Sequence, residues 1–99
     1  MELRTIQKNQ NVICENGAYI FFSYGSEIAK ITNQKNNNLK FTNLWNYSKT
    51  TLKYLYIFLE QYKNEISNNV YTKILNALNS KNKKASFEKL INEKIIKSI

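Results

Sequence analysis

The sequence contains no histidine, no aspartate and no proline, and it has one cysteine and two glycines. Without histidine or aspartate, the chain cannot form a Ser-His-Asp or Cys-His nucleophile, a histidine zinc site or an aspartate-ligated magnesium site. Among the glutamates, Glu60 and Glu65 lie near Lys63, and Glu88 and Glu93 alternate with lysines, which is typical of solvated charge pairs. We therefore expect a protein that is not an enzyme and that uses no cofactor, metal or catalytic residue.

Long apolar runs are also missing. No run approaches the roughly 18 residues of a membrane span, and the first ten residues hold no apolar stretch of the signal-peptide type. The single cysteine, Cys14, lies in a strand-like run, which favours a buried, reduced thiol over a reactive one. We expect a soluble cytoplasmic protein without a membrane partner.

The charge is strongly positive, with 15 Lys and Arg against 7 acidic residues and a net charge of +8. Such a balance favours anionic partners such as RNA or DNA. Two observations weaken this interpretation. Only Arg4 is an arginine, the residue that specific recognition prefers, and Lys, Asn, Ile and Tyr make up about half of the chain, as AT-rich genes encode.

The first part of the chain has the pattern of short strands separated by turns. Strands are predicted at about 10–15 and 18–24, and Asn16-Gly17 between them is a strong signal for a type I′ hairpin turn. Gly25 marks a second tight turn before a third strand in "EIAKIT". The polar run "NQKNNN" predicts an exposed loop before a fourth strand at about 39–43.

After residue 48 the apolar residues recur at helical spacing, and three helices are predicted. The first covers about 49–63 with Ser48 as its N-cap, and the second about 68–79 with Ser67 as its N-cap. The second helix is expected to bury Val70, Ile74, Leu75 and Leu78. The third covers about 86–98, with an apolar stripe formed by Phe87, Leu90, Ile91, Ile95 and Ile99.

This order predicts an α+β fold, in which an N-terminal antiparallel β-meander of three to four strands is followed by three α-helices packed on one face. We expect a single domain over residues 1–99, with a β-rich part at about 10–43 and a helical part at about 48–99.

The stretch "WNYSKTTLKYL" at residues 45–55 is the strongest candidate site. Free N–H groups at a helix start favour an anion, and Lys49 and Lys53 add positive charge. The alternative is that Ser48 only caps the helix while Thr50 and Thr51 face water. The densest lysine cluster, in "SKNKKAS", has the same two interpretations, a binding surface or a solvated loop. The candidate partner-binding or nucleic-acid-binding residues are Tyr24, Ser48, Lys49, Thr50, Lys53, Tyr54, Lys81, Lys83 and Lys84.

Aromatic residues alternate along the second predicted strand. Tyr19 and Phe21 should share one face and Phe22 and Tyr24 the other, so one pair is expected in the core and the other partly exposed. An exposed pair on a basic sheet can stack nucleic-acid bases or dock against a protein.

The segments "SYGSEIAKI" and "LKFTNLWNYSKTTLKYLYIFL" resemble a family of short proteins of phages and prophages, with the pattern S-Y-x-T-P-V-A, then W or Y, S, x, T-T, x-K-H. Ser26 and Glu27 replace the Thr-Pro of that pattern, and Tyr54 replaces its histidine. The resemblance implies a phage or mobile-element origin, and no established activity comes with it.

Small phage proteins without catalytic residues usually bind host machinery stoichiometrically. Our leading hypothesis is a binder of a host protein or nucleoprotein complex in the bacterial cytoplasm, with an anti-CRISPR inhibitor of an RNA-guided effector as the favoured instance. One alternative is an accessory protein that binds RNA or DNA directly. Another is a structural phage component that self-assembles, for which a homodimer would be expected.

Overall fold

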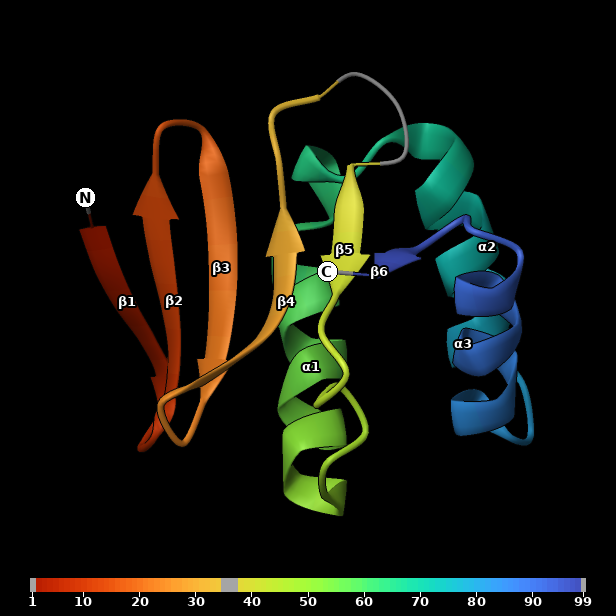
Figure 1. Cartoon of the computed structure of the whole chain (residues 1–99), viewed down its shortest axis with the longest axis horizontal. Helices are drawn as coiled ribbons and strands as arrows, with labels where there is room; N and C mark the ends of the chain where they lie inside the picture. The colour runs from red at the N-terminus through yellow and green to blue at the C-terminus, as the bar shows by residue number, and fades with distance from the viewer. Residues whose placement is uncertain (1, 35–37, 99) are drawn as a thin grey trace.

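The structure, a computed structural model, describes residues 2–34 and 38–98. An N-terminal antiparallel meander is followed by three α-helices, which confirms the predicted α+β class (Figure 1). The elements are β1 (Glu2–Gln7), β2 (Gln10–Glu15), β3 (Ala18–Ser23), β4 (Ser26–Ile31), β5 (Leu39–Phe41), α1 (Lys49–Gln61), the 3₁₀ helix η1 (Lys63–Glu65), α2 (Asn68–Leu78), α3 (Lys83–Asn92) and β6 (Lys97–Ser98).

The six strands form one sheet in the order β1-β2-β3-β4-β5-β6, with neighbours antiparallel from β1 to β5. The predicted turn between β2 and β3 is confirmed, because Asn16 and Gly17 both have positive φ, of 52° and 78°. The turn between β3 and β4 is built in the same way from Tyr24 and Gly25, at 52° and 81°. Two-residue turns of this kind fix the register of the strands that they join.

Two strands lie outside the ranges that the sequence predicts. β1 precedes the predicted β-rich part, and its polar composition gives no clear alternation of apolar residues. β6 falls within the predicted helical part and pairs with β5 in parallel, with Lys40 opposite Lys97. The predicted boundaries of 10–43 and 48–99 are therefore wrong at the start of the first part and at the end of the second.

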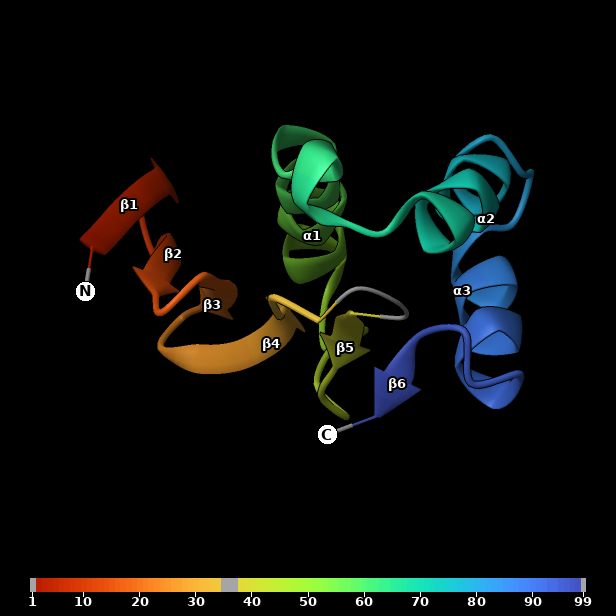
Figure 2. The same ribbon diagram turned by 90° about the horizontal axis from the view of Figure 1, so that it is seen from above.

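Helix α1 packs on one face of the sheet (Figure 2). Its side chains Leu55, Phe58 and Leu59 are fully buried, and the rings of Phe58 and Phe21 of β3 are stacked with centroids 5.4 Å apart. The prediction for the second strand is confirmed in part, since Phe21 lies in the core while Phe22 on the other face is half-buried. Cys14 is also only half-buried, so the prediction of a buried thiol is wrong.

Helices α2 and α3 stand beyond the β5–β6 end of the sheet (Figure 2). Phe87 of α3 joins this pair to the rest of the molecule, because its ring lies within 6.3 Å of Phe41, Trp45 and Tyr56. The expectation that Leu75 is buried is wrong, since it is 40% exposed. Leu75 directly follows the buried Ile74, so its side chain points about 100° away from that of Ile74 around the helix axis. The other side chains of α2 that were predicted to be buried are buried or half-buried: Val70, Ile74 and Leu78.

The predicted third helix ends too late in the sequence. α3 stops at Asn92, and Lys94 adopts a positive φ of 61°, which reverses the chain. The N–H groups of Ile95 and Ile96 then both donate to the carbonyl of Leu90. This reversal carries Ile96 into the core, where it is fully buried, and leads into β6.

The predicted loop "NQKNNN" is described at residues 33, 34 and 38, and the other three lie outside the described residues. Asn38 contradicts the expectation of exposure, because it is 3% exposed. Its Nδ2 donates to the carbonyls of Thr32 and Glu65, at 2.9 and 2.7 Å, and its Oδ1 accepts from the N–H of Ser67 at 3.0 Å. This one side chain ties the start of β5 to the start of α2.

Candidate functional site

The side-chain hydroxyls of Ser48 and Thr51 form hydrogen bonds at the N-terminus of α1. Ser48 is the N-cap, as predicted: its Oγ accepts the N–H of Thr51 at 3.1 Å, and its hydroxyl donates to Thr51 Oγ1, also at 3.1 Å. Thr51 Oγ1 lies 3.1 Å from Ser23 Oγ on β3. Thr51 is fully buried, so the expectation that it faces water is wrong, whereas Thr50 is exposed. Ser48 therefore caps α1, and Thr51 joins the start of the helix to β3.

Lys49 and Lys53 are both exposed on the first turns of α1. The Nζ of Lys53 lies 5.4 Å from the centroid of the Tyr54 ring, a cation–π contact. Tyr54 itself is half-buried and packs against the core. Tyr54 therefore serves folding, while the two lysines present charge to the surroundings.

Beside this helix start, three exposed hydrophobic side chains border one hollow of about 220 Å³. They are Tyr24, Leu44 and Tyr47, with exposed fractions of 56%, 37% and 69%, and we call them the aromatic end. The turn between β3 and β4 and the start of α1 lie at the same end of the molecule, the lower end in Figure 1. Tyr24 is one of the predicted site residues, whereas Leu44 and Tyr47 are not.

The connection between β5 and α1 explains how Leu44 and Tyr47 reach the surface. Trp45 is only 6% exposed and anchors this connection in the core. Its neighbours form tight turns, in which the N–H of Trp45 bonds the carbonyl of Thr42 and the N–H of Tyr47 bonds that of Leu44. Thr42 Oγ1 in turn donates to the carbonyl of Glu27 at 2.7 Å. The two exposed side chains are thus held on a fixed backbone.

The lysines Lys81, Lys83 and Lys84 lie elsewhere, between α2 and the first turn of α3. All three are exposed, and the helix that they precede or begin is capped by Asn82, whose Oδ1 accepts the N–H of Ala85 at 3.1 Å. The structure therefore separates the predicted site residues into two groups on different elements.

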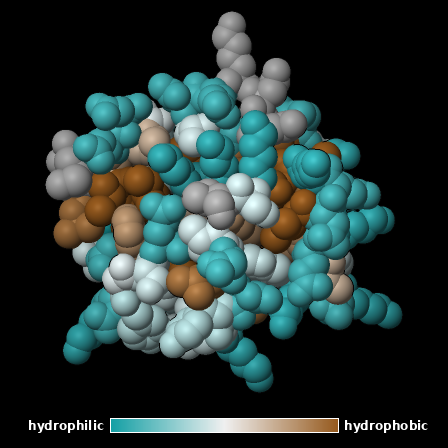
Figure 3. Space-filling model, viewed as in Figure 1, coloured by the Kyte–Doolittle hydropathy of each residue, from teal (hydrophilic) through white to brown (hydrophobic). Residues whose placement is uncertain are grey.

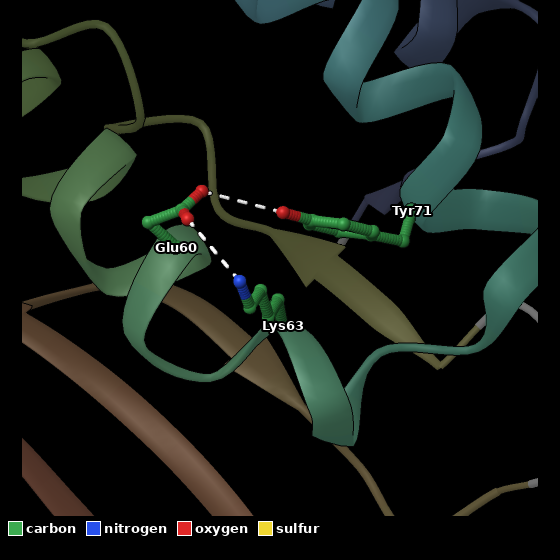
Figure 4. A network of polar contacts seen from close by, with 3 residues as sticks. All are labelled: Glu60, Lys63 and Tyr71. Atoms are coloured by element: carbon green, nitrogen blue, oxygen red, sulfur yellow. Dashed lines mark hydrogen bonds and ion pairs between the residues drawn. The ribbon is translucent and has the colours of Figure 1, made fainter.

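Among the acidic residues, Glu60 makes contacts with two other side chains. Glu60 lies between two partners, with its Oε1 3.6 Å from Lys63 Nζ and its Oε2 accepting a 3.3 Å bond from the Tyr71 hydroxyl (Figure 4). Burial raises the pKa of Tyr71, and the charge of Glu60 raises it further. Glu60 and Lys63 are about half exposed, which fits the predicted solvated pair.

Two features are absent from residues 2–34 and 38–98, a metal-binding cluster and a membrane-spanning helix. No cluster of three His, Cys, Asp or Glu side chains that could hold a metal ion is found there. None of the helices in these ranges has the length and apolar character that crossing a membrane requires.

A family model matches residues 1–89. The chain belongs to DUF8033, a family of unknown function. The match runs from β1 into α3, and so includes the aromatic end and every predicted site residue. Neither a curated protein nor a solved structure matches the chain.

Proposed function

We propose that this member of DUF8033 is a non-enzymatic protein that binds a partner stoichiometrically through its aromatic end. The observation that carries the proposal is the clustering of exposed hydrophobic side chains. Of the five large hydrophobic side chains exposed among the described residues, three border the same hollow: Tyr24, Leu44 and Tyr47. Scattered exposed hydrophobic residues need no explanation, whereas a cluster marks an interaction surface. Tyrosine is also enriched among the residues that dominate binding energy.

The proposed partner is a host protein or nucleoprotein complex, and the proposed origin is a phage or mobile element. The origin rests on the sequence resemblance to short phage proteins around "WNYSKTTLKYL". The choice of partner rests on charge, because Lys49 and Lys53 stand beside the aromatic end on a chain with a net charge of +8. An anti-CRISPR inhibitor of an RNA-guided effector is the favoured instance.

The experiment compares variants in affinity purification from host cells, with mass spectrometry and sequencing of the recovered nucleic acid. Tyr24→Asn with Tyr47→Ser removes both exposed rings. Asparagine tolerates the positive φ at position 24, so the turn is kept and we expect an unchanged thermal midpoint. A partner that the parent protein recovers should be lost with this double variant. Full recovery of the same partner would exclude the aromatic end as the binding surface.

Charge reversal at Lys49 and Lys53 tests the contribution of positive charge to the same binding. Lys49→Glu with Lys53→Glu should leave the fold intact, since both side chains are exposed, and should weaken partner binding at least tenfold, an effect of about 1.4 kcal/mol. Lys83→Glu with Lys84→Glu is the matched control, because it changes the net charge equally at a different place. Equal losses in both variants would mean that the attraction is diffuse, and a loss in the control alone would move the site to the start of α3.

A further inference from the structure

The face of the sheet opposite α1 is not covered by any of the described helices (Figure 2). Burial alternates along β5, where Leu39 and Phe41 point into the core and Lys40 between them does not. Figure 3 looks onto this uncovered face and shows hydrophobic side chains gathered over β1 and β2 at its left. The uncovered face therefore has hydrophobic side chains over β1 and β2 and a lysine on β5.

Three lysines stand in register across this face. Lys30 of β4 pairs with Lys40 of β5, and Lys40 pairs with Lys97 of β6. Neighbouring strands are about 4.8 Å apart, so the three backbone positions span about 10 Å. Like charges directly opposite one another destabilise a sheet. None of the three takes part in an ion pair with a described residue. We call Lys30, Lys40 and Lys97 the lysine row.

The same line continues into apolar residues on the other half of the sheet. Lys30 is opposite Ile20, Ile20 is opposite Ile13, and Ile13 is opposite Leu3, which is 65% exposed. Phe22, two residues along β3 from Ile20, lies half-buried on this face. Two carboxylates share this face, because Glu15 lies two residues along β2 from Ile13 and Glu27 is opposite Phe22. The lysine row is the part of the face where three cations stand side by side with no carboxylate between them.

A hollow of about 360 Å³ lies where the two halves meet. Ile20 and Lys30 line it together with the amide residues Asn16, Asn33 and Gln34 and with one acidic residue, Glu15. Amide side chains offer both donors and acceptors, which are the groups that pair with the edges of nucleobases. Cationic, apolar and amide groups therefore converge at one place on the sheet.

We propose that the uncovered sheet face binds single-stranded nucleic acid, with phosphates on the lysine row and bases against the apolar strip and the hollow. A single strand offers a line of charges and exposed bases together, and sheets bind it by combining positive charge with apolar contacts. A duplex keeps its bases inside and would leave the apolar strip unused. An acidic protein is a weaker match, because it brings no bases to the apolar strip, whereas lysine is a common binder of phosphate.

The proposal goes beyond the proposed function, since it concerns a different surface and holds whether or not a protein docks on the aromatic end. A second copy of the chain is a poor occupant of this face. The lysine row contains no carboxylate, and each chain carries a net charge of +8. Face-to-face pairing would therefore have to overcome the overall repulsion between two positively charged chains.

The test measures binding of fluorescent 12-nucleotide oligo-dT and oligo-U by anisotropy over a range of salt concentrations. Each phosphate contact to a single strand contributes about 0.7 to the slope of log affinity against log salt, so the lysine row predicts a slope of about −2. Lys30→Gln with Lys40→Gln and Lys97→Gln should lower affinity at least tenfold and remove most of that slope. Lys97→Gln alone, at an exposed position, should reduce the slope by about 0.7 and needs no rearrangement of the fold.

Lys81→Gln with Lys83→Gln and Lys84→Gln removes the same charge from exposed positions elsewhere, and it should change affinity by less than about twofold. Equal losses in the two triple variants would overturn the proposal in favour of diffuse attraction. Poly-glutamate binding as tightly as the oligonucleotides would overturn it in favour of an acidic protein. Tighter binding of a 12-base-pair duplex, or no binding of either oligonucleotide, would overturn it as well.

Discussion

The meander and the helical half are held together by interactions of different range. In the meander two successive strand pairs, β2–β3 and β3–β4, are joined by two-residue turns in which both residues adopt positive φ, Asn16-Gly17 and Tyr24-Gly25. In the helical half the decisive contacts join residues far apart in the sequence, such as Asn38 with Ser67 and Phe41 with Phe87. We infer that substitutions in the meander act mainly on one turn, whereas those in the helical half loosen several elements at once.

The largest effect should come from Phe87→Ala. Phe87 is fully buried and packs against rings from β5, from the connection before α1 and from α1 itself. Truncating a buried phenylalanine costs about 3 to 5 kcal/mol, which approaches the whole stability of a small domain. Denaturant unfolding should show this loss. Phe87→Leu keeps most of the apolar volume and should cost less than about 1.5 kcal/mol. Similar, small costs for both would mean that α3 is not fastened through this ring.

This difference in range also explains what the sequence predicts well. The turn at Asn16-Gly17 and the N-cap at Ser48 are both correct, because each depends on residues next to one another in the chain. The predicted end of the third helix is wrong, because Ile95 continues the helical apolar pattern, whereas the structure buries Ile96 by turning the chain back toward β5. Helical periodicity carries no information about such a return.

Asn38→Ala should have the next largest effect. The substitution removes three hydrogen bonds between β4, β5 and the start of α2, and it leaves the Ser67 N–H without its Asn38 acceptor. Losing the partner of a buried polar group costs about 1 to 3 kcal/mol, and we expect about 2 kcal/mol in denaturant unfolding. Asn43→Ala makes the same chemical change at an exposed position and should be neutral within about 0.5 kcal/mol. Equal costs at both positions would contradict the role of Asn38.

The candidate site was only partly predictable from the sequence, because part of it depends on contacts between residues far apart in the chain. Tyr24 could be found from strand alternation, and Lys49 and Lys53 from their places at a helix start. Leu44 and Tyr47 belong to the aromatic end only because Trp45 between them is anchored in the core. The lysine row depends on the register of β4, β5 and β6, and β6 itself was not predicted.

The smallest of these effects should come from the meander, where Gly17→Val tests a single turn. Gly17 has a φ of 78°, which a β-branched residue resists, and an added Cβ would lie 3.3 Å from Asn33 Cβ. We expect a loss of about 1 to 2 kcal/mol in denaturant unfolding, with the packing of α2 and α3 unaffected. Gly17→Asn provides the control, because asparagine accepts positive φ, and it should cost clearly less than valine.

Gly25→Val separates strain from contact, since Gly25 has a φ of 81° and nothing lies within 4 Å of an added Cβ. If valine costs more at position 17 than at 25, the Asn33 contact adds to the backbone strain. A loss at position 17 that exceeds that of Asn38→Ala would show that the meander, and not the helical half, governs the stability of the fold.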